Sequence, residues 1–94
     1  MKDEWLDADC AIKHLYNKKI ISMCDWQRQH PSDQSYSVQF DRYRDDSNYH
    51  VGVITLFIIK RSGKYYTTRS GIRALSGIYH FDGSDIFSQC AIEF

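Results

Sequence analysis

The chain has 94 residues, of which 43% are hydrophobic and 15% aromatic, and its formal net charge is zero. A chain of this length and composition forms one compact domain with its own core, residues 1–94, which excludes a two-domain arrangement. With a single proline and no repeats or low-complexity tracts, the sequence is neither a disordered linker nor a solenoid, and its charge gives no reason to expect indiscriminate binding to duplex nucleic acid.

The N-terminal segment predicts an amphipathic helix over residues 4–17. Asp3 is placed to cap this helix, because a carboxylate before the first turn accepts hydrogen bonds from backbone N–H groups. The apolar residues that recur at helical spacing are Trp5, Ala8, Ile12, Leu15 and Tyr16. Lys18 and Lys19 follow the last turn, where the helix dipole favours cations.

Residues 20–28 fit either of two structures. The spacing of Ile20, Met23 and Cys24 could continue a helix, whereas the β-branched residues at the start of the segment are typical of a short strand. We expect a second helical segment here. The segment 30–33, which contains the proline, then ends it.

The middle of the chain predicts antiparallel strands. Residues 34–41 alternate between apolar and polar side chains, and a polar turn follows at 45–48. The segment 51–59 is apolar almost throughout, which predicts a strand that is covered on both faces, by a helix on one side and by a second layer or a second copy of the protein on the other. The turn at 62–63 then closes a hairpin with a returning strand at 64–70.

The last part of the chain predicts an irregular piece at 71–77 and two further strands. These strands, at 77–81 and 86–94, would be joined by a hairpin turn at Asp82-Gly83. The predicted fold class is therefore α+β, with an N-terminal helix, or two helical segments, packed on a four- to five-stranded antiparallel sheet.

Location and redox state are predicted from the N-terminus and the cysteines. The first ten residues are acidic and lack the pattern of a signal peptide, and no apolar stretch approaches the ~18 residues that a spanning helix needs. Cys10, Cys24 and Cys90 cannot all pair within one chain, and their spacing differs from that of a secreted disulfide framework. We expect a cytoplasmic protein with reduced, mostly buried thiols and no membrane partner.

Two groups of side chains are candidates for chemical sites. Cys10 and His14 are four residues apart and share a helix face, and a zinc site could be completed from Cys24, His30, His80 and Cys90. His50 and His80, with Asp82 and Asp85, could supply the general acid and base of a metal-independent nuclease. No CxxC pair, phosphate-binding loop or other catalytic motif is present. We therefore expect no metal, no cofactor and no enzymatic activity, with the nuclease as an alternative.

A binding surface is predicted from the charge pattern. Residues 34–75 carry seven Lys or Arg against three Asp, interleaved with aromatic residues. Tyr, Trp and Arg dominate protein interfaces, and the same side chains stack and neutralise single-stranded nucleic acid. The predicted partner-binding residues are Tyr43, Arg44, Tyr65, Tyr66, Arg69, Arg73 and Trp26.

The function predicted from this surface is that of a protein-binding module, an adaptor or inhibitor that occupies a surface on another protein. Small inhibitors encoded by phage or mobile elements have this scale, which is an analogy. The alternative partner for the same face is single-stranded nucleic acid. Self-association into a homodimer through the apolar strand is the further expectation.

Overall fold

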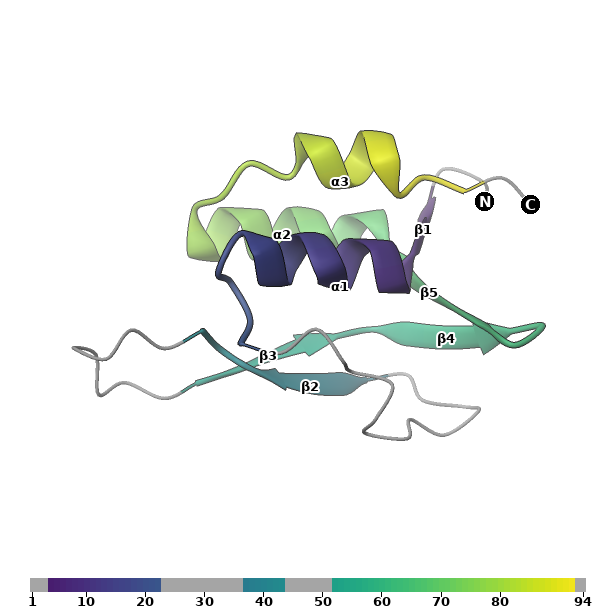
Figure 1. Ribbon diagram of the computed structural model, residues 1–94, viewed down its shortest axis with the longest axis horizontal. Helices are drawn as coiled ribbons and strands as arrows, with labels where there is room; N and C mark the ends of the chain where they lie inside the picture. The colour runs from purple at the N-terminus through teal and green to yellow at the C-terminus, as the bar shows by residue number, and fades with distance from the viewer. Residues whose placement is uncertain (1–3, 23–36, 44–51, 93–94) are drawn as a thin grey trace.

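The structure is a computed structural model, which describes residues 4–22, 37–43 and 52–92 (Figure 1). Its elements in chain order are β1 (Trp5–Asp7), α1 (Ala8–Asn17), β2 (Val38–Asp41), β3 (Val53–Leu56), β4 (Ile58–Arg61), β5 (Lys64–Thr68), α2 (Arg69–Tyr79) and α3 (Ser84–Gln89). The described strands form a three-stranded antiparallel sheet of order β1-β5-β4 and a two-stranded antiparallel sheet of β2 and β3. The predicted α+β class is confirmed.

The N-terminal helix begins later than the sequence predicts. Trp5–Asp7 form strand β1, which pairs with β5, and the helix runs from Ala8 to Asn17. Its cap is Asp7, whose Oδ1 accepts a hydrogen bond from the backbone N–H of Cys10 at 3.0 Å. The predicted cap, Asp3, lies outside the described residues. Pairing with β5 explains the late start, because it fixes an extended backbone just before the cap.

The buried face of α1 agrees only in part with the predicted stripe. The residues of α1 that are buried are Ala8, Ala11, Ile12 and Leu15. Tyr16 is expected on this face, but 41% of its surface is exposed, and Trp5 belongs to β1. The predicted helical arrangement of the core-facing side chains therefore holds for the middle of the stripe and fails at both ends.

The chain after α1 runs beside β2 and is not helical where it is described. Ile21 forms an antiparallel bridge with Arg42. The N–H of Ser22 donates to the carbonyl of Asp41, and the N–H of Tyr43 donates to the carbonyl of Ile20, each at 3.0 Å. The expected helical segment is thus wrong at 20–22, and residues 23–28 lie outside the described residues.

The long apolar segment is divided between the two sheets. β3 pairs with β2, β4 pairs with β5, and Phe57 lies between them with 43% of its surface exposed. The hydroxyl of Thr67 donates to the carbonyl of Phe57 at 2.8 Å, which satisfies a backbone acceptor where the strand pairing changes.

Only one face of this segment is buried within the described chain. Ile54, Leu56 and Ile58 are buried, whereas Val53 is 52% exposed. The side chains alternate about the pleat, and among the described elements no second layer covers the outer face, contrary to the expectation of cover on both sides. Cover by a second copy of the protein stays a prediction.

The alternation in β2 and the β4–β5 hairpin agree with the sequence predictions. Val38 and Phe40 are buried while their neighbours in β2 are exposed. In the hairpin, Arg61 pairs with Lys64 around a two-residue turn in which Ser62 and Gly63 have φ angles of 53° and 78°. Two consecutive positive φ angles match the twist of the flanking strands, and glycine adopts such an angle without strain.

The last part of the chain is helical where strands and an irregular piece are predicted. α2 occupies Arg69–Tyr79, and α3 occupies part of the predicted final strand. The Thr68 hydroxyl accepts a hydrogen bond from the N–H of Gly71 at 3.1 Å and caps α2. Ile72 and Leu75, three residues apart, are buried. This cap and this burial outweigh the low helix propensity of the glycines and serines in α2.

Asp82-Gly83 also does not form the predicted hairpin. The Oδ1 atom of Asp82 accepts a hydrogen bond from the N–H of Ser84 at 2.9 Å, which turns the chain into α3. The chain then returns to the sheet, where Ala91 bridges Leu6. The three helices lie on one side of β2, β3 and β4, with the hydrophobic core between the two layers (Figure 1).

Candidate functional site

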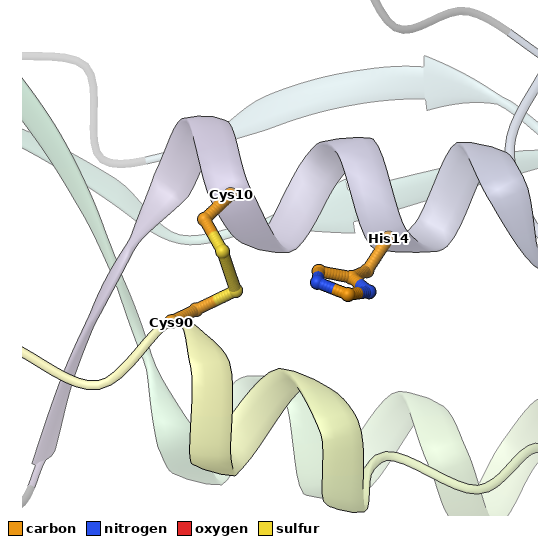
Figure 2. Close-up of side chains that lie close together, drawn as sticks. All are labelled: Cys10, His14 and Cys90. Atoms are coloured by element: carbon orange, nitrogen blue, oxygen red, sulfur yellow. A yellow bond between two sulfur atoms is a disulfide. The ribbon is translucent and has the colours of Figure 1, made fainter.

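A disulfide bond between Cys10 and Cys90 joins α1 to the end of α3 (Figure 2). The two Cα atoms are 5.5 Å apart, although the residues are separated by 80 positions in the sequence. Cys90 is buried and Cys10 is half-buried. The expectation of reduced thiols is therefore wrong for these two residues. Cys24 lies outside the described residues.

Backbone contacts place these two cysteines side by side. The N–H of Asp7 donates to the carbonyl of Cys90 at 2.8 Å, and the N–H of Cys90 donates to the carbonyl of Ile86 at 2.9 Å. Asp7 in turn caps α1 through the N–H of Cys10. The positions of both cysteines are thus fixed by β1, the α1 cap and the last turn of α3. No local sequence signal indicates a contact of this kind, because it depends on the packing of α3 against α1.

His14 lies next to the disulfide. A ring nitrogen of His14 and the sulfur atoms of Cys10 and Cys90 all lie within 4.8 Å of one another. Cys10 and His14 are one helical turn apart on the face of α1 that meets α3. The predicted pairing of Cys10 with His14 is confirmed as a spatial cluster, and Cys90 is its third member.

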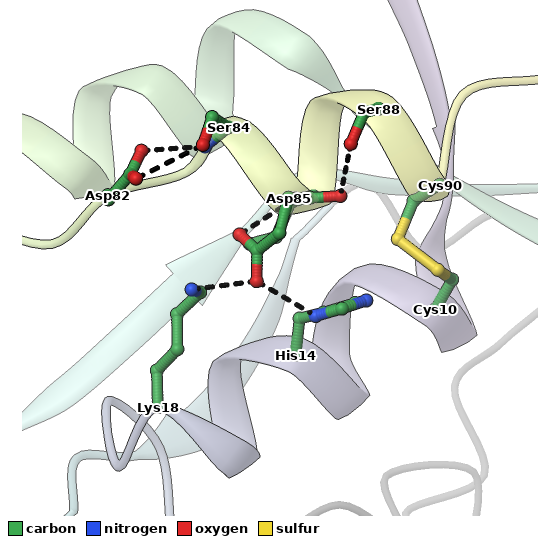
Figure 3. A network of polar contacts seen from close by, with 9 residues as sticks. Cys10, His14, Lys18, Asp82, Ser84, Asp85, Ser88 and Cys90 are labelled. Carbon is green, nitrogen blue, oxygen red and sulfur yellow. Dashed lines mark hydrogen bonds and ion pairs between the residues drawn. A yellow bond between two sulfur atoms is a disulfide. The ribbon is translucent and has the colours of Figure 1, made fainter.

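The other side of the His14 ring contacts α3. Its Nδ1 atom lies 3.2 Å from Oδ2 of Asp85, and the side chains of His14 and Asp85 are 22% and 33% exposed. Figure 3 shows the second ring nitrogen on the side of the disulfide. When Nδ1 donates its proton to the carboxylate, the neutral ring keeps an unprotonated Nε2, which lies on the side of the disulfide.

Lys18 completes the row of side chains along α1. Cys10, His14 and Lys18 are spaced four residues apart, so all three face α3 (Figure 3). The Nζ atom of Lys18 lies 2.8 Å from Oδ2 of Asp85. This hydrogen bond lowers the pKa of Asp85 below its ordinary value of 3.8, with the N–H of Ile86 acting in the same direction against the effect of burial. Asp85 is therefore a carboxylate at neutral pH.

Asp82 has a separate role at the start of α3. The pKa of Asp82 is lowered by hydrogen bonds from the backbone N–H of Ser84 and then from the Ser84 hydroxyl. Its carboxylate is thus held by the turn before α3. Asp82 therefore helps to begin α3.

No protein-family model matches this chain, and neither a curated protein nor a solved structure matches it. None of the described helices has the length and apolar character that crossing a membrane requires. The chemistry of the described side chains is therefore the basis for any proposal about function.

The remaining histidines do not join this cluster where they are described. His80 is exposed and ends α2 in the left-handed conformation, with a φ angle of 57°. Of the residues predicted as candidate zinc ligands, Cys10, His14 and Cys90 are brought together, while Cys24 and His30 lie outside the described residues. His50 lies outside them too, so the pairing of His50 with His80 stays a prediction.

The predicted partner-binding tyrosines of β5 face opposite sides of the sheet. Tyr65 is packed against the core, with the Nζ atom of Lys60 at 5.6 Å from its ring centre. Tyr66, the next residue, therefore points to the other face, where it pairs with Ile59 and Asp7. These two rings are not brought together into one patch.

Arg69 and Arg73 lie together on α2. Their guanidinium groups are 5.2 Å and 5.6 Å from the centre of the Phe87 ring of α3. The two cations therefore contribute to the packing of α2 against α3, as well as to the charge of this surface. Arg44 and Trp26, the remaining predicted contacts apart from Tyr43, lie outside the described residues.

Tyr43 belongs to a cluster at the ends of α1, β2 and α2, which lie at the same end of the molecule (Figure 1). The Nζ atom of Lys19 is 5.8 Å from the centre of the Tyr43 ring, and the Arg42 guanidinium is 4.8 Å from the centre of the Tyr79 ring. Ile78, beside Tyr79, is 63% exposed. We refer to Lys19, Arg42, Tyr43, Ile78 and Tyr79 as the cation–aromatic surface.

The sequence prediction misses most of this surface. It assigns Lys19 to the helix end, and Ile78 and Tyr79 to a strand. The sequence does contain one signal of this surface, the alternation of basic and aromatic residues in Arg42-Tyr43-Arg44. The sequence does not predict that α2 ends beside β2, because the local pattern does not predict α2 at all.

Proposed function

We propose that this protein is a non-enzymatic protein-binding module, an adaptor or inhibitor, and that the cation–aromatic surface is its contact surface. The observation that carries the proposal is two cation–aromatic pairs at the same end of the molecule, Lys19 with Tyr43 and Arg42 with Tyr79. Tyrosine and arginine are among the side chains most enriched at the positions that dominate binding energy in protein interfaces. The scale of the protein agrees with small phage-encoded inhibitors, by analogy only.

The backbone of this surface is held in place, which favours binding. The N–H of Tyr43 donates to the carbonyl of Ile20 at 3.0 Å, and the N–H of Arg42 donates to the carbonyl of Gly52 at 2.9 Å. Tyr43 nevertheless keeps 39% of its surface exposed. Since these residues are already ordered, a partner would not need to immobilise them, and the entropic cost of association is reduced.

The chemistry of the surface indicates what the partner presents. Lys19 and Arg42 are cations, and Ile78 adds an exposed apolar side chain. A complementary protein surface would carry carboxylates around an apolar or aromatic centre. We place Tyr65, Tyr66, Arg69 and Arg73 outside this contact, because β5 and the first half of α2 lie away from the end of the molecule where α1, β2 and α2 finish (Figure 1).

Single-stranded nucleic acid is the competing partner for the same side chains, because bases stack on tyrosine while cations contact phosphate. The dependence of affinity on salt concentration distinguishes a protein partner from a nucleic-acid partner. Affinity that depends on phosphate contacts falls steeply as salt is added, whereas an interface centred on aromatic and apolar contacts falls less.

The experiment compares capture of host proteins by the wild-type chain and by Arg42→Ala/Tyr43→Ala. Arg61→Ala/Tyr66→Ala, with the same residue types on the β4–β5 hairpin, is the matched control. We expect the first variant to lose at least ~90% of a captured partner, equivalent to more than ~1.4 kcal/mol, and the control to keep it. Equal capture by both variants, or binding of labelled single strands that disappears between low and high salt, would contradict the proposal.

A cytoplasmic location remains part of the proposal, and the disulfide sets a condition on it. Disulfides persist in oxidising compartments and are rare in the cytosol, where thiols are kept reduced. A cytoplasmic protein would therefore carry Cys10 and Cys90 mainly as thiols. Alkylation of free thiols before the host cells are broken, followed by mass spectrometry, measures this. A disulfide in nearly all molecules would contradict the cytoplasmic location.

A further inference from the structure

We propose that reduction of the Cys10–Cys90 disulfide converts the cluster of Cys10, His14 and Cys90 into a binding site for a zinc ion. These side chains supply two sulfur atoms and one imidazole nitrogen, all within 4.8 Å of one another. Protein zinc sites use these donors at about 2.0–2.3 Å from the ion, which places neighbouring donor atoms about 3.3–3.8 Å apart in a tetrahedron. Once the sulfur atoms are no longer bonded to each other, a small separation reaches this spacing.

The site keeps its position when the disulfide is absent, because hydrogen bonds hold both cysteines in place independently of the S–S bond. Asp7 caps α1 at the N–H of Cys10 and donates its own N–H to the carbonyl of Cys90. The Cα atoms of the two cysteines, 5.5 Å apart, are therefore fixed by β1 and the helix ends. Two thiols produced by reduction would still face each other.

His14 is oriented for this role by Asp85. A histidine that binds a metal usually donates its other ring N–H to a carboxylate, which fixes the tautomer and the direction of the ring. Nδ1 of His14 lies 3.2 Å from Oδ2 of Asp85, and the second ring nitrogen lies on the side of the sulfur atoms (Figure 3). This carboxylate–histidine arrangement is the second observation, independent of the cysteines, that points to a metal ligand.

The disulfide-bonded state and the zinc-bound state exclude each other, because both use the same two sulfur atoms. A dithiol reductant gives two electrons and two protons to the disulfide, which becomes two thiols while the reductant becomes a disulfide. Binding of zinc then replaces the two thiol protons, so that two S–Zn bonds form and two protons are released. The three ligands found among the described residues leave a fourth position, which water can fill. In the oxidised state Cys10 and Cys90 carry no thiolate, so the site is open to zinc only under reducing conditions.

The test uses the full chain in its oxidised and reduced forms. Protein reduced under nitrogen with a phosphine, which takes up oxygen from water as it reduces the disulfide, is titrated with Zn²⁺ against a chromophoric chelator. A parallel titration with Co²⁺ detects thiolate ligands through their charge-transfer absorption. We expect the reduced chain to bind one ion with thiolate absorption, and the oxidised chain to bind none.

Three variants assign the ligands. His14→Gln should weaken zinc binding by at least 100-fold, and Asp85→Asn by about 10–100-fold. Cys24→Ser should leave binding unchanged. Circular dichroism of each reduced variant shows whether it is folded, so a loss of binding is assigned to the ligand only in a folded protein.

Four results would overturn the proposal. They are failure of the folded, reduced chain to bind zinc, equal binding by the oxidised chain, unchanged binding by His14→Gln, and a reduced chain that is unfolded and does not regain structure with zinc. None of these results depends on whether the cation–aromatic surface binds a partner.

Discussion

His14 and Asp85 meet across the contact between α1 and α3, with Nδ1 of one 3.2 Å from Oδ2 of the other. Lys18, one turn along α1, binds the same carboxylate oxygen at 2.8 Å. The disulfide lies one turn in the opposite direction. α3 is therefore held against α1 by a covalent bond and by an ion pair on a single helix face. Because the two depend on different chemistry, experiments can separate their contributions.

The disulfide is expected to stabilise the fold substantially. It closes a loop in which the cysteines are 80 positions apart, and disulfides that restrict the unfolded chain in this way typically contribute about 2–4 kcal/mol. Cys10→Ser/Cys90→Ser should lower the free energy of unfolding by that amount, measured by urea unfolding without a reductant. Cys24→Ser is the control and should change little. Equal unfolding midpoints for the double variant and the wild type would show that the bond contributes nothing.

The ion pair predicts a dependence of stability on pH. The pKa of Asp85 is lowered in the folded state, first by the hydrogen bond from Lys18. Its contribution is therefore fully present above the ordinary value of 3.8 and is lost as the pH falls through the lowered folded-state value. Asp85→Asn should reduce stability at pH ~6–7, and the difference from the wild type should disappear near pH ~2.

Urea midpoints measured across this range test the prediction about Asp85. Asp41→Asn, on the exposed face of β2, is the matched control. A difference between wild type and Asp85→Asn that stays constant down to the lowest pH would mean that the ionised carboxylate is not the source of the stabilisation.

Two glycines of α2 provide a matched pair. Gly77 lies within the helix, and a Cβ atom added there would meet nothing within 4 Å. Alanine has a helix propensity about 1 kcal/mol better than glycine, so Gly77→Ala should raise the free energy of unfolding by about 0.5–1 kcal/mol. At Gly71 the added Cβ would lie 2.9 Å from the Thr68 hydroxyl that caps the helix, so that gain should be lost or reversed.

Thermal unfolding of Gly71→Ala and Gly77→Ala, followed by circular dichroism, measures the contrast between them. Thr68→Ala, which removes the cap without touching either glycine, should cost about 1 kcal/mol. If both alanine variants were stabilised equally, the Thr68 cap would have to adjust without cost.

The parts of the fold that are predictable from sequence are those fixed by local chemistry. The alternation of Val38 and Phe40 with polar neighbours sets the buried face of β2. Ser62-Gly63 adopts the two positive φ angles of a tight hairpin. α2 is not predictable in the same way, because its glycines and serines weaken the local helix preference. Its existence depends on the burial of Ile72 and Leu75 against other elements.

In the candidate sites, too, only the features that are set by local sequence are predictable. The spacing of Cys10 and His14 is enough to place both on one helix face. Their partners, Asp85 and Cys90, are more than seventy positions away and are brought near only by the packing of α3 on α1. Similarly, Arg42 and Tyr43 are identifiable from the sequence, whereas Lys19, Ile78 and Tyr79 come from other elements of the fold. Contacts at long sequence separation carry no local pattern.

The outer face of the β3–β4 segment predicts self-association. Val53 and Phe57 are 52% and 43% exposed, and they lie on the same face because they are four positions apart along an extended chain. Apolar side chains that are exposed side by side on one face mark interaction sites, and a second copy of the chain offers the same surface. Phe57→Ser should shift the protein toward monomer in sedimentation equilibrium, with at least a tenfold weaker dimer.

Thr55→Ser, on the same exposed face, is the control and should leave the dimer unchanged. A chain that sediments as a monomer at every concentration tested would remove self-association from the account of this surface.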